Sequence, residues 1–139
     1  MVDVHDRLIR SFNMSRVKAK DTKPELIVRK FLFSKGFRYK LHEAKLSGCP
    51  DLYLPKYKTA IFVNGCFWHG HDGCKYFVIP KTRSDGWLAK INRTKERDAI
   101  ATSKLQNTGI QTVTIFECEL RSAKRADTLH KLIQTLLNT

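Results

Sequence analysis

The chain has 139 residues, of which 26 are Lys or Arg and 13 are Asp or Glu, giving a formal net charge of +13. Its hydrophobic content of 42% excludes a wholly disordered protein. No apolar run approaches the ~18 residues of a membrane span, and the first residues do not form a signal peptide. We therefore expect one soluble intracellular domain, 1–139, whose charge predicts a polyanionic partner: DNA, RNA or an anionic membrane surface.

The positive charge is uneven along the chain. Residues 1–40 carry a net charge of +7, residues 41–80 carry +1, and residues 81–139 carry +5. This distribution suggests chemistry in the middle and phosphate contacts on both sides, although a solvated basic face would look the same. Residues 1–20 show no clear period and are predicted to form a basic arm.

The first predicted helix follows the arm. Thr22 can cap it, Pro24 lies in its first turn, and Glu25 occupies the third position of a capping box. Gly36 suits its end. Residues 37–42 then alternate apolar with polar side chains, which predicts a half-buried strand.

The rest of the chain alternates short β segments with helices. Residues 50–55 form a short extended segment, 59–63 a buried strand, and 64–84 a loop. A helix over about 85–106, a strand over 111–116 and a helix over 126–137 complete the chain. This order predicts an α/β fold, a central mixed β-sheet flanked by helices.

A metal site is indicated by Cys66, His71 and Cys74, which lie within nine positions of a glycine-rich stretch. Thiolates and imidazoles are zinc ligands, and Cys118 at the end of the last strand is the expected fourth. His69 and Asp72 are rival ligands. Disulfides among the four cysteines are the alternative, which a reducing compartment disfavours.

Asp51 follows a proline at the start of an apolar segment. A carboxylate there is well sited to bind Mg²⁺, the kind of ion that phosphodiester hydrolysis needs, although a plain turn Asp is the alternative. Cys49, just before it, is expected to be a small buried core residue.

Adjacent aromatics in a basic protein suggest base stacking. Phe67 and Trp68 lie in the predicted loop and could wedge between bases or form a small core around the metal. Trp87 at a helix start is equally open to both readings. Met14 could enter a DNA groove or attach the arm to the body.

The sequence resembles the very-short-patch-repair (Vsr) mismatch endonucleases, a branch of the PD-(D/E)xK restriction-endonuclease-like fold. The matching motifs are Asp3-Val4-His5-Asp6, Asn13-Met14, Pro50-Asp51, Asn64-Gly65-Cys66-Phe67-Trp68-His69, Glu96-Arg97-Asp98 and Glu117-Cys118. The resemblance implies a Mg²⁺-dependent enzyme that nicks one strand of double-stranded DNA at a T·G mismatch arising from 5-methylcytosine deamination, which starts very short patch repair.

The resemblance also implies roles for individual residues. Asp51 and the backbone carbonyl of Val63 would bind Mg²⁺, His69 would assist proton transfer, and Glu25 and Asp98 would support the metal-water cluster. The structural zinc ligands would be Cys66, His71, Cys74 and Cys118, and the residues entering the duplex would be Met14, Phe67, Trp68 and Trp87.

One position departs from the family. Asn64 stands where relatives often have a His, and an amide cannot exchange a proton as an imidazole does. We expect a cytoplasmic, bacterial or phage-encoded monomer, associated with the nucleoid through DNA and with host mismatch-repair proteins as possible partners. The alternatives are a Vsr-like homing or restriction-type nuclease with another target, or a non-catalytic zinc DNA-binding module.

Overall fold

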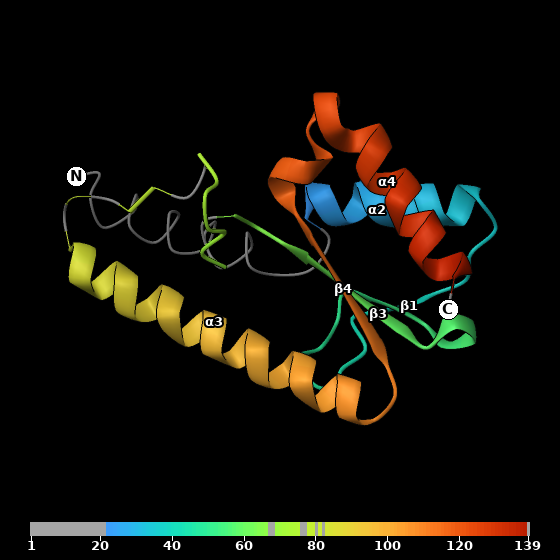
Figure 1. The fold of residues 1–139 in the computed structure, drawn as a ribbon, viewed down its shortest axis with the longest axis horizontal. Coiled ribbons are helices and arrows are strands. Elements are labelled where there is room, and N and C mark those ends of the chain that lie inside the picture. Colours follow the sequence, from blue (N-terminus) through green and yellow to red (C-terminus); the bar gives the residue numbers. More distant parts are fainter. Residues whose placement is uncertain (1–21, 67–68, 76–77, 80, 82, 139) are drawn as a thin grey trace, which may run out of the picture.

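The computed structural model describes residues 22–66, 69–75, 78, 79, 81 and 83–138. Within this part of the chain, three α-helices pack around a mixed sheet of four strands in the order β1-β2-β3-β4 (Figure 1). The first three strands pair antiparallel, whereas β3 and β4 pair in parallel, with Thr59 opposite Gln111 and Asn64 opposite Phe116. The predicted α/β class with a mixed sheet is confirmed.

The elements, in chain order, are α2 (Lys23–Ser34), β1 (Lys40–Leu41), β2 (Leu52–Leu54), the 3₁₀ helix η1 (Pro55–Tyr57), β3 (Thr59–Asn64), α3 (Ser84–Asn107), β4 (Gln111–Phe116), the 3₁₀ helix η2 (Glu117–Leu120) and α4 (Ser122–Leu137).

Helix α2 begins as the sequence predicts. The Thr22 hydroxyl accepts from the Glu25 N–H at 3.4 Å, and Pro24 lies in the first turn, where its missing N–H costs no helical bond. Gly36, with φ of +88°, follows the last turn and adopts the left-handed conformation that allows the chain to turn toward the sheet.

Three predictions are wrong in detail. The strand expected over 37–42 is reduced to Lys40–Leu41, because Phe37 turns into the core and His42 has a φ of +47° that ends the extended backbone. Helix α4 begins four residues before the predicted 126, since its first turn is exposed and carries no apolar pattern. Cys49 is exposed in a tight turn with φ of +49°, not buried.

The two faces of the sheet are covered differently. Helices α2 and α4 lie together on one face, and the long α3 runs along the other (Figure 1). Side chains alternate accordingly along β3: Ile61 packs among the buried residues of α2 and α4, whereas Ala60 packs with Leu105 and Ile110 on the α3 side. This arrangement places the end of β3 between α2 and α3, near several of the residues that the sequence proposes for catalysis and metal binding.

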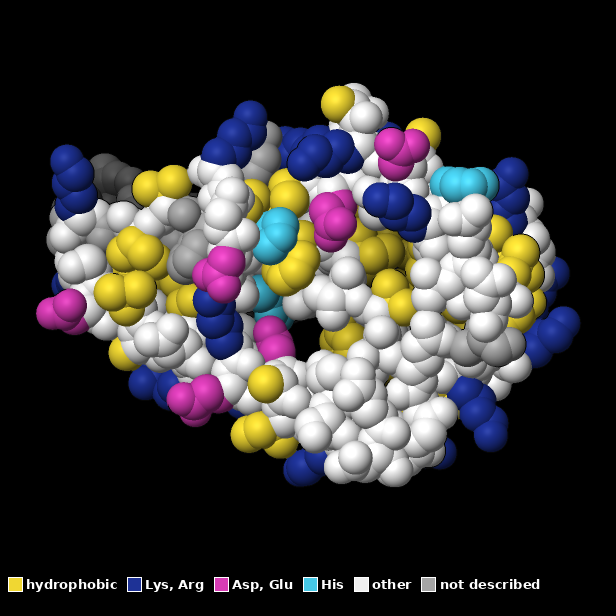
Figure 2. Space-filling view, in the orientation of Figure 1, with side chains coloured by type: hydrophobic (Ala, Val, Ile, Leu, Met, Phe, Trp, Pro, Cys, Tyr) yellow, Lys and Arg dark blue, Asp and Glu magenta, His cyan; other side chains and the backbone are white. Residues whose placement is uncertain are grey.

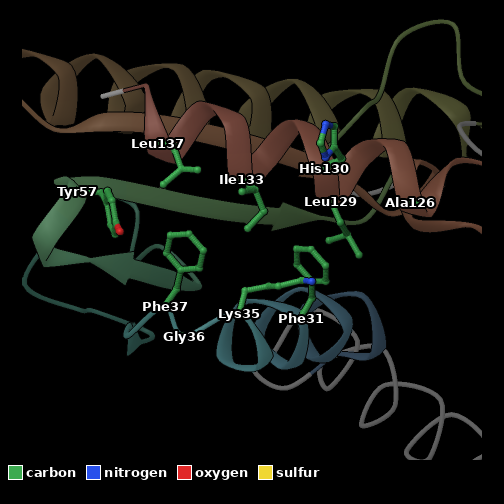
Figure 3. A pocket seen from close by; sticks show the side chains of 10 residues that line it. All are labelled: Phe31, Lys35, Gly36, Phe37, Tyr57, Ala126, Leu129, His130, Ile133 and Leu137. Atoms are coloured by element: carbon green, nitrogen blue, oxygen red, sulfur yellow. The ribbon is translucent and has the colours of Figure 1, made fainter.

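A hollow of about 640 Å³ opens between α2 and α4 (Figure 3). Its wall is mostly apolar, with Phe31 and Phe37 from one side and Leu129 and Ile133 from the other. None of the residues proposed from the sequence for catalysis or metal binding lines it. No helix in the described ranges is long and apolar enough to cross a membrane.

Candidate active site and metal centres

The predicted zinc ligands form one cluster. The ligand atoms of Cys66, His71, Cys74 and Cys118 all lie within 4.8 Å of one another. Cys66 is almost fully buried, its Sγ accepts the Cys118 N–H at 3.4 Å, and the Cys118 Sγ lies 3.4 Å from the His71 Nδ1. Four ligands at zinc bond lengths in a tetrahedron lie about 3.5 Å apart, so the cluster fits a structural zinc ion.

Backbone hydrogen bonds and a ring contact help to position these ligands. The His71 N–H donates to the Cys66 carbonyl at 2.9 Å, and the Cys74 N–H donates to the His71 carbonyl at 3.2 Å. The His71 ring stacks on Phe116, with centroids 3.8 Å apart and planes 3° from parallel. No disulfide joins any of the four cysteines, all of which lie in the described part of the chain, so the disulfide alternative is wrong in this structure.

Burial makes the thiols of this cluster reluctant to ionise. It raises the pKa of Cys66 to about 12, and it also raises the pKa of Cys118. Since zinc binds thiolates, ion binding must displace these protons, and the ion's own charge supplies the driving force.

The rival zinc ligands lie elsewhere. Asp72 is exposed and pairs with Lys95 of α3, with the Lys95 Nζ 3.0 Å from the Asp72 Oδ1. The His69 Nδ1 lies 2.7 Å from the Asp98 Oδ2, also on α3. The loop that carries the cluster is thus attached to α3 at two points, one of which orients a histidine.

A second cluster is made of Glu25, His42 and Asp51. Their ligand atoms also lie within 4.8 Å of one another, and the set could hold a metal ion. Glu25 is only 1% exposed although it is ionisable, and its Oε2 lies 2.8 Å from the His42 Nε2 and 3.1 Å from the Arg29 Nη1. A buried carboxylate needs such partners, because an isolated buried charge is costly.

The sheet register brings this second cluster together. Leu41 pairs with Leu52, so the next residues along, His42 and Asp51, face each other, and the His42 N–H donates to the Asp51 carbonyl at 3.0 Å. On the other side, the Asp51 Oδ2 accepts the Val63 N–H at 2.7 Å. Asp51 is therefore fixed between β1 and β3 at the start of β2.

Burial raises the pKa of the Asp51 carboxyl from 3.8 to about 6. The hydrogen bond from Val63 lowers it, but the nearby Glu25 carboxylate adds to the rise. Two carboxylates crowded in one partly dry site favour a cation between them, since a cation relieves both their desolvation and their mutual repulsion.

The two catalytic candidates are linked through the end of β3. Asp51 is bonded to the Val63 N–H, and the His69 N–H donates to the carbonyl of Gly65 at 3.2 Å. These attachment points are two residues apart, roughly 7 Å in an extended chain. A carboxylate pair that can hold a cation and a histidine hydrogen-bonded to Asp98 are thus attached to neighbouring residues of the chain, close to Cys66 of the Cys₃His cluster.

The amino-acid sequence of the chain is matched by known proteins. The family model for the DNA mismatch endonuclease Vsr matches residues 2–75, more than half of the chain. The chain belongs to the Vsr family. It is therefore a DNA endonuclease, and the nuclease family implies the use of a divalent metal.

Relatives of known name extend the match over nearly the whole chain. It is 42% identical to the Type II nicking enzyme V.NmeAIP of Neisseria meningitidis, over 98% of this chain and 97% of that protein. It is 38% identical to the DNA mismatch endonuclease Vsr of Escherichia coli, over 90% of this chain and 80% of that one.

A solved structure supports the fold alone. The homing endonuclease I-Bth0305I catalytic domain superposes with a TM-score of 0.53 at 24% identity, covering 84% of this chain and 94% of that domain. The restriction-endonuclease-like fold expected from the sequence agrees with this nuclease neighbour.

Of the four residues predicted to enter the DNA duplex, the structure describes Trp87 alone. Trp87 lies in the first turn of α3, half-buried, with the Lys90 Nζ 5.5 Å from its ring centroid. Met14, Phe67 and Trp68 lie outside the described residues.

The surface carries a matching charge pattern. In Figure 2, His and acidic side chains gather beside a hollow in the middle of the face, while Lys and Arg side chains lie mostly around its edge. Such an edge suits contact with the DNA backbone around a central reactive site.

Sequence reasoning missed His42 and Arg29. His42 was included only as the last residue of a predicted strand, and Arg29 as an ordinary helix position. The signal for Arg29 was its spacing from Glu25, since residues four apart share a helix face. His42 could be found only from the β1–β2 register, which residue patterns did not specify.

Proposed function

We propose that this Vsr family enzyme nicks one strand of duplex DNA at a T·G mismatch left by deamination of 5-methylcytosine, and so starts very short patch repair with Mg²⁺ as its cofactor. The similarity to the mismatch endonuclease of Escherichia coli over 90% of the chain supports this target. The observation that supports the proposal is that the Asp51 cluster and the His69–Asp98 pair are hydrogen-bonded to Val63 and Gly65, two residues apart at the end of β3.

Asp51 and Glu25 supply the carboxylates for the cation. The Val63 carbonyl is a third ligand. In a strand the N–H and C=O of one residue point to the same side, and the Val63 N–H already donates to Asp51, so its carbonyl faces the same site. The bound ion would neutralise charge developing on the scissile phosphate and lower the pKa of the attacking water.

His69 assists proton transfer, and Asp98 positions it. A carboxylate at Nδ1 holds the proton there and leaves Nε2 as the acceptor that a general base needs. This role for Asp98 differs from the support of the metal-water cluster that the resemblance implied.

Zinc bound by Cys66, His71, Cys74 and Cys118 has a structural role. A closed set of four protein ligands leaves no open position for substrate. The ion joins the loop that carries His69 to the end of β4, so that it stabilises the position of the histidine.

The basic flanks bind the DNA backbone, and the aromatics enter the duplex. Residues 1–20 form the predicted arm, with Met14 in one groove and Phe67, Trp68 and Trp87 in the other. A T·G pair costs less to unstack than a matched pair, so insertion itself contributes to selectivity. We expect a monomer that works in the cytoplasm on nucleoid DNA, with host mismatch-repair proteins acting after it.

The test is a nicking assay on end-labelled duplexes that differ in one base. The enzyme should nick the T·G duplex in the presence of Mg²⁺ and leave the T·A and C·G duplexes intact. Equal nicking of all three would overturn mismatch recognition while leaving the endonuclease assignment in place.

A second target is favoured by one comparison. The relative with 42% identity is named a Type II nicking enzyme, a name that mentions nicking but no mismatch. Under this alternative, the protein nicks a defined sequence in matched DNA. A library of matched duplexes, sequenced at the nick, would reveal such a site.

A further inference from the structure

His42 lies inside the cluster that we propose to bind the catalytic cation. Its Nε2 is 2.8 Å from the Glu25 Oε2, and it lies within 4.8 Å of the Asp51 carboxylate atom. The His42 side chain is 13% exposed and that of Glu25 is 1% exposed, so the two groups meet in a largely dry space. A hydrogen-bonded pair at this distance leaves both atoms close enough to share one cation instead of one proton.

Two segments, helix α2 and the start of β2, hold His42 where it is. The His42 N–H donates to the Asp51 carbonyl at 3.0 Å. From α2, the Glu25 Oε2 lies 2.8 Å from the His42 Nε2, and Arg29 donates to the same oxygen at 3.1 Å, which holds the Glu25 carboxylate in place. His42 also has a φ of +47°, a left-handed backbone conformation that residues other than glycine adopt at a cost in free energy. Such a conformation persists only where the surrounding structure imposes it, and it is concentrated at functional sites.

The chemistry of this donor set differs from that of a purely acidic site. Mg²⁺ prefers oxygen ligands and keeps much of its water, whereas imidazole nitrogen favours first-row transition metals. A nitrogen beside two carboxylates therefore raises the affinity for Mn²⁺ more than the affinity for Mg²⁺.

We propose that His42 is a ligand of the divalent cation bound by Glu25 and Asp51, and that it makes this centre selective for Mn²⁺ over Mg²⁺. The inference rests on the proposed cation site of Asp51, but it does not require the T·G target. It adds a ligand that the sequence motifs do not include.

The first experiment detects the nitrogen directly. Mn²⁺ is added to the full-length, zinc-loaded protein without DNA, and pulsed electron paramagnetic resonance is recorded. The wild type should show coupling of the electron spin to ¹⁴N, and labelling histidine with ¹⁵N should replace that coupling. The absence of nitrogen coupling in the wild type would overturn the proposal without any variant.

Variants then identify the histidine. His42→Gln should lose the coupling, because glutamine offers no ring nitrogen. Its amide can still bond to Glu25, so the substitution should leave that carboxylate in place. His69→Gln should keep it, as should His130→Gln, an exposed position on α4. Coupling that persists in His42→Gln, or that disappears in His69→Gln, would show that His42 is not the ligand.

Metal affinities give an independent measurement. Calorimetric titration should show that His42→Gln weakens Mn²⁺ binding about tenfold or more, with a clearly smaller effect on Mg²⁺. An unchanged ratio of the two affinities would mean that His42 only holds Glu25 in place. Thermal unfolding and zinc content of each variant serve as the fold check.

The outcome is separable from that of the proposed function. If nitrogen coupling is found but T·G and matched duplexes are nicked alike, the His42 ligand stands and the mismatch target falls. If T·G duplexes are nicked selectively but no nitrogen coupling is seen, the target stands and the His42 ligand falls.

Discussion

Three of the four ligands in the Cys₃His cluster come from a single loop, whereas Glu25, His42 and Asp51 come from α2, the turn after β1 and the start of β2. The electrostatics differ as well. Because burial raises the pKa of the Cys66 thiol, the Cys₃His cluster needs a metal ion to become charged. In the second cluster, the Glu25 carboxylate already has two partners, the Arg29 guanidinium and the His42 imidazole. We infer that the first cluster is completed by its ion, while the second is assembled by the fold and binds its ion afterwards.

The largest expected effect is at the ligand that closes the zinc loop. Cys118→Ser removes the only zinc ligand from outside that loop, and structural zinc contributes on the order of 10 kcal/mol to the folding of small zinc domains. We expect zinc to be lost from the purified protein, the melting temperature to fall, and nicking to be abolished.

Cys49→Ser is the matched control for that substitution, because Cys49 is exposed and outside the cluster. Its zinc content, melting temperature and activity should equal those of the wild type. A Cys118→Ser protein that keeps one equivalent of zinc would contradict the assignment of the four ligands.

The next largest effect is expected at the cation site. Asp51→Asn should reduce nicking roughly 10³-fold or more, since a catalytic metal supplies several kcal/mol of transition-state stabilisation. Zinc content should be unchanged and DNA affinity should stay within a few-fold, because the amide oxygen can still accept the Val63 N–H. Single-turnover nicking and a gel-shift assay measure the two properties.

Asp72→Asn is the control for charge alone. Asp72 is exposed and its ion pair with Lys95 lies at the surface, where such pairs contribute little. Its nicking rate should stay within about twofold of the wild type. Comparable losses in both variants would mean that the net charge, not the position of Asp51, controls activity.

The same contrast explains what the sequence could predict. The Cys₃His ligands were visible because three of them lie within nine positions among glycines, and strand β4 was predicted over the residues it occupies, Gln111–Phe116. Local patterns specify local structure. The role of His42 could not be predicted, because its contact with Asp51 depends on the register between β1 and β2. That register pairs residues far apart in the chain.

Polar elements were also hard to predict. The first turn of α4 has no apolar residue pointing to a core, so hydrophobic periodicity placed its start too late. Cys49 was wrongly expected in the core because cysteine is usually buried, a preference overridden here by a turn with positive φ.

A smaller effect is expected at the pair that joins the zinc loop to α3. His69→Gln should lower the nicking rate by about 10²-fold, the lower end of the usual contribution of a general acid or base. Asp98→Asn should cost less, because the imidazole remains and only its orientation and tautomer are disturbed. Both variants should retain zinc, which metal analysis verifies. An Asp98→Asn loss as large as that of His69→Gln would mean that Asp98 contacts the reacting groups itself.

The smallest effect is a pH dependence confined to the second cluster. The pKa of Asp51 rises to about 6 in the folded protein, from 3.8. Folding therefore favours the protonated carboxyl, so this contribution to stability is fully present below pH ~4 and is lost as the pH rises through about 6. In buffer without added divalent cation, Asp51→Asn should lack this loss and should be the more stable protein at pH 8, by at most about 3 kcal/mol.

Adding Mg²⁺ or Mn²⁺ should reverse that order, because only the wild-type carboxylate gains from binding the ion. Urea unfolding at pH 4.5, 6 and 8, with and without the cation, measures both effects. The Cys49→Ser control should unfold as the wild type does under each condition. If the wild type is the more stable protein at pH 8 even without the cation, then Asp51 is stabilised as a carboxylate by the fold alone. In that case the Asp51 carboxylate would not need a metal ion to be stable in the fold, and the proposed difference between the second cluster and the Cys₃His cluster would be wrong.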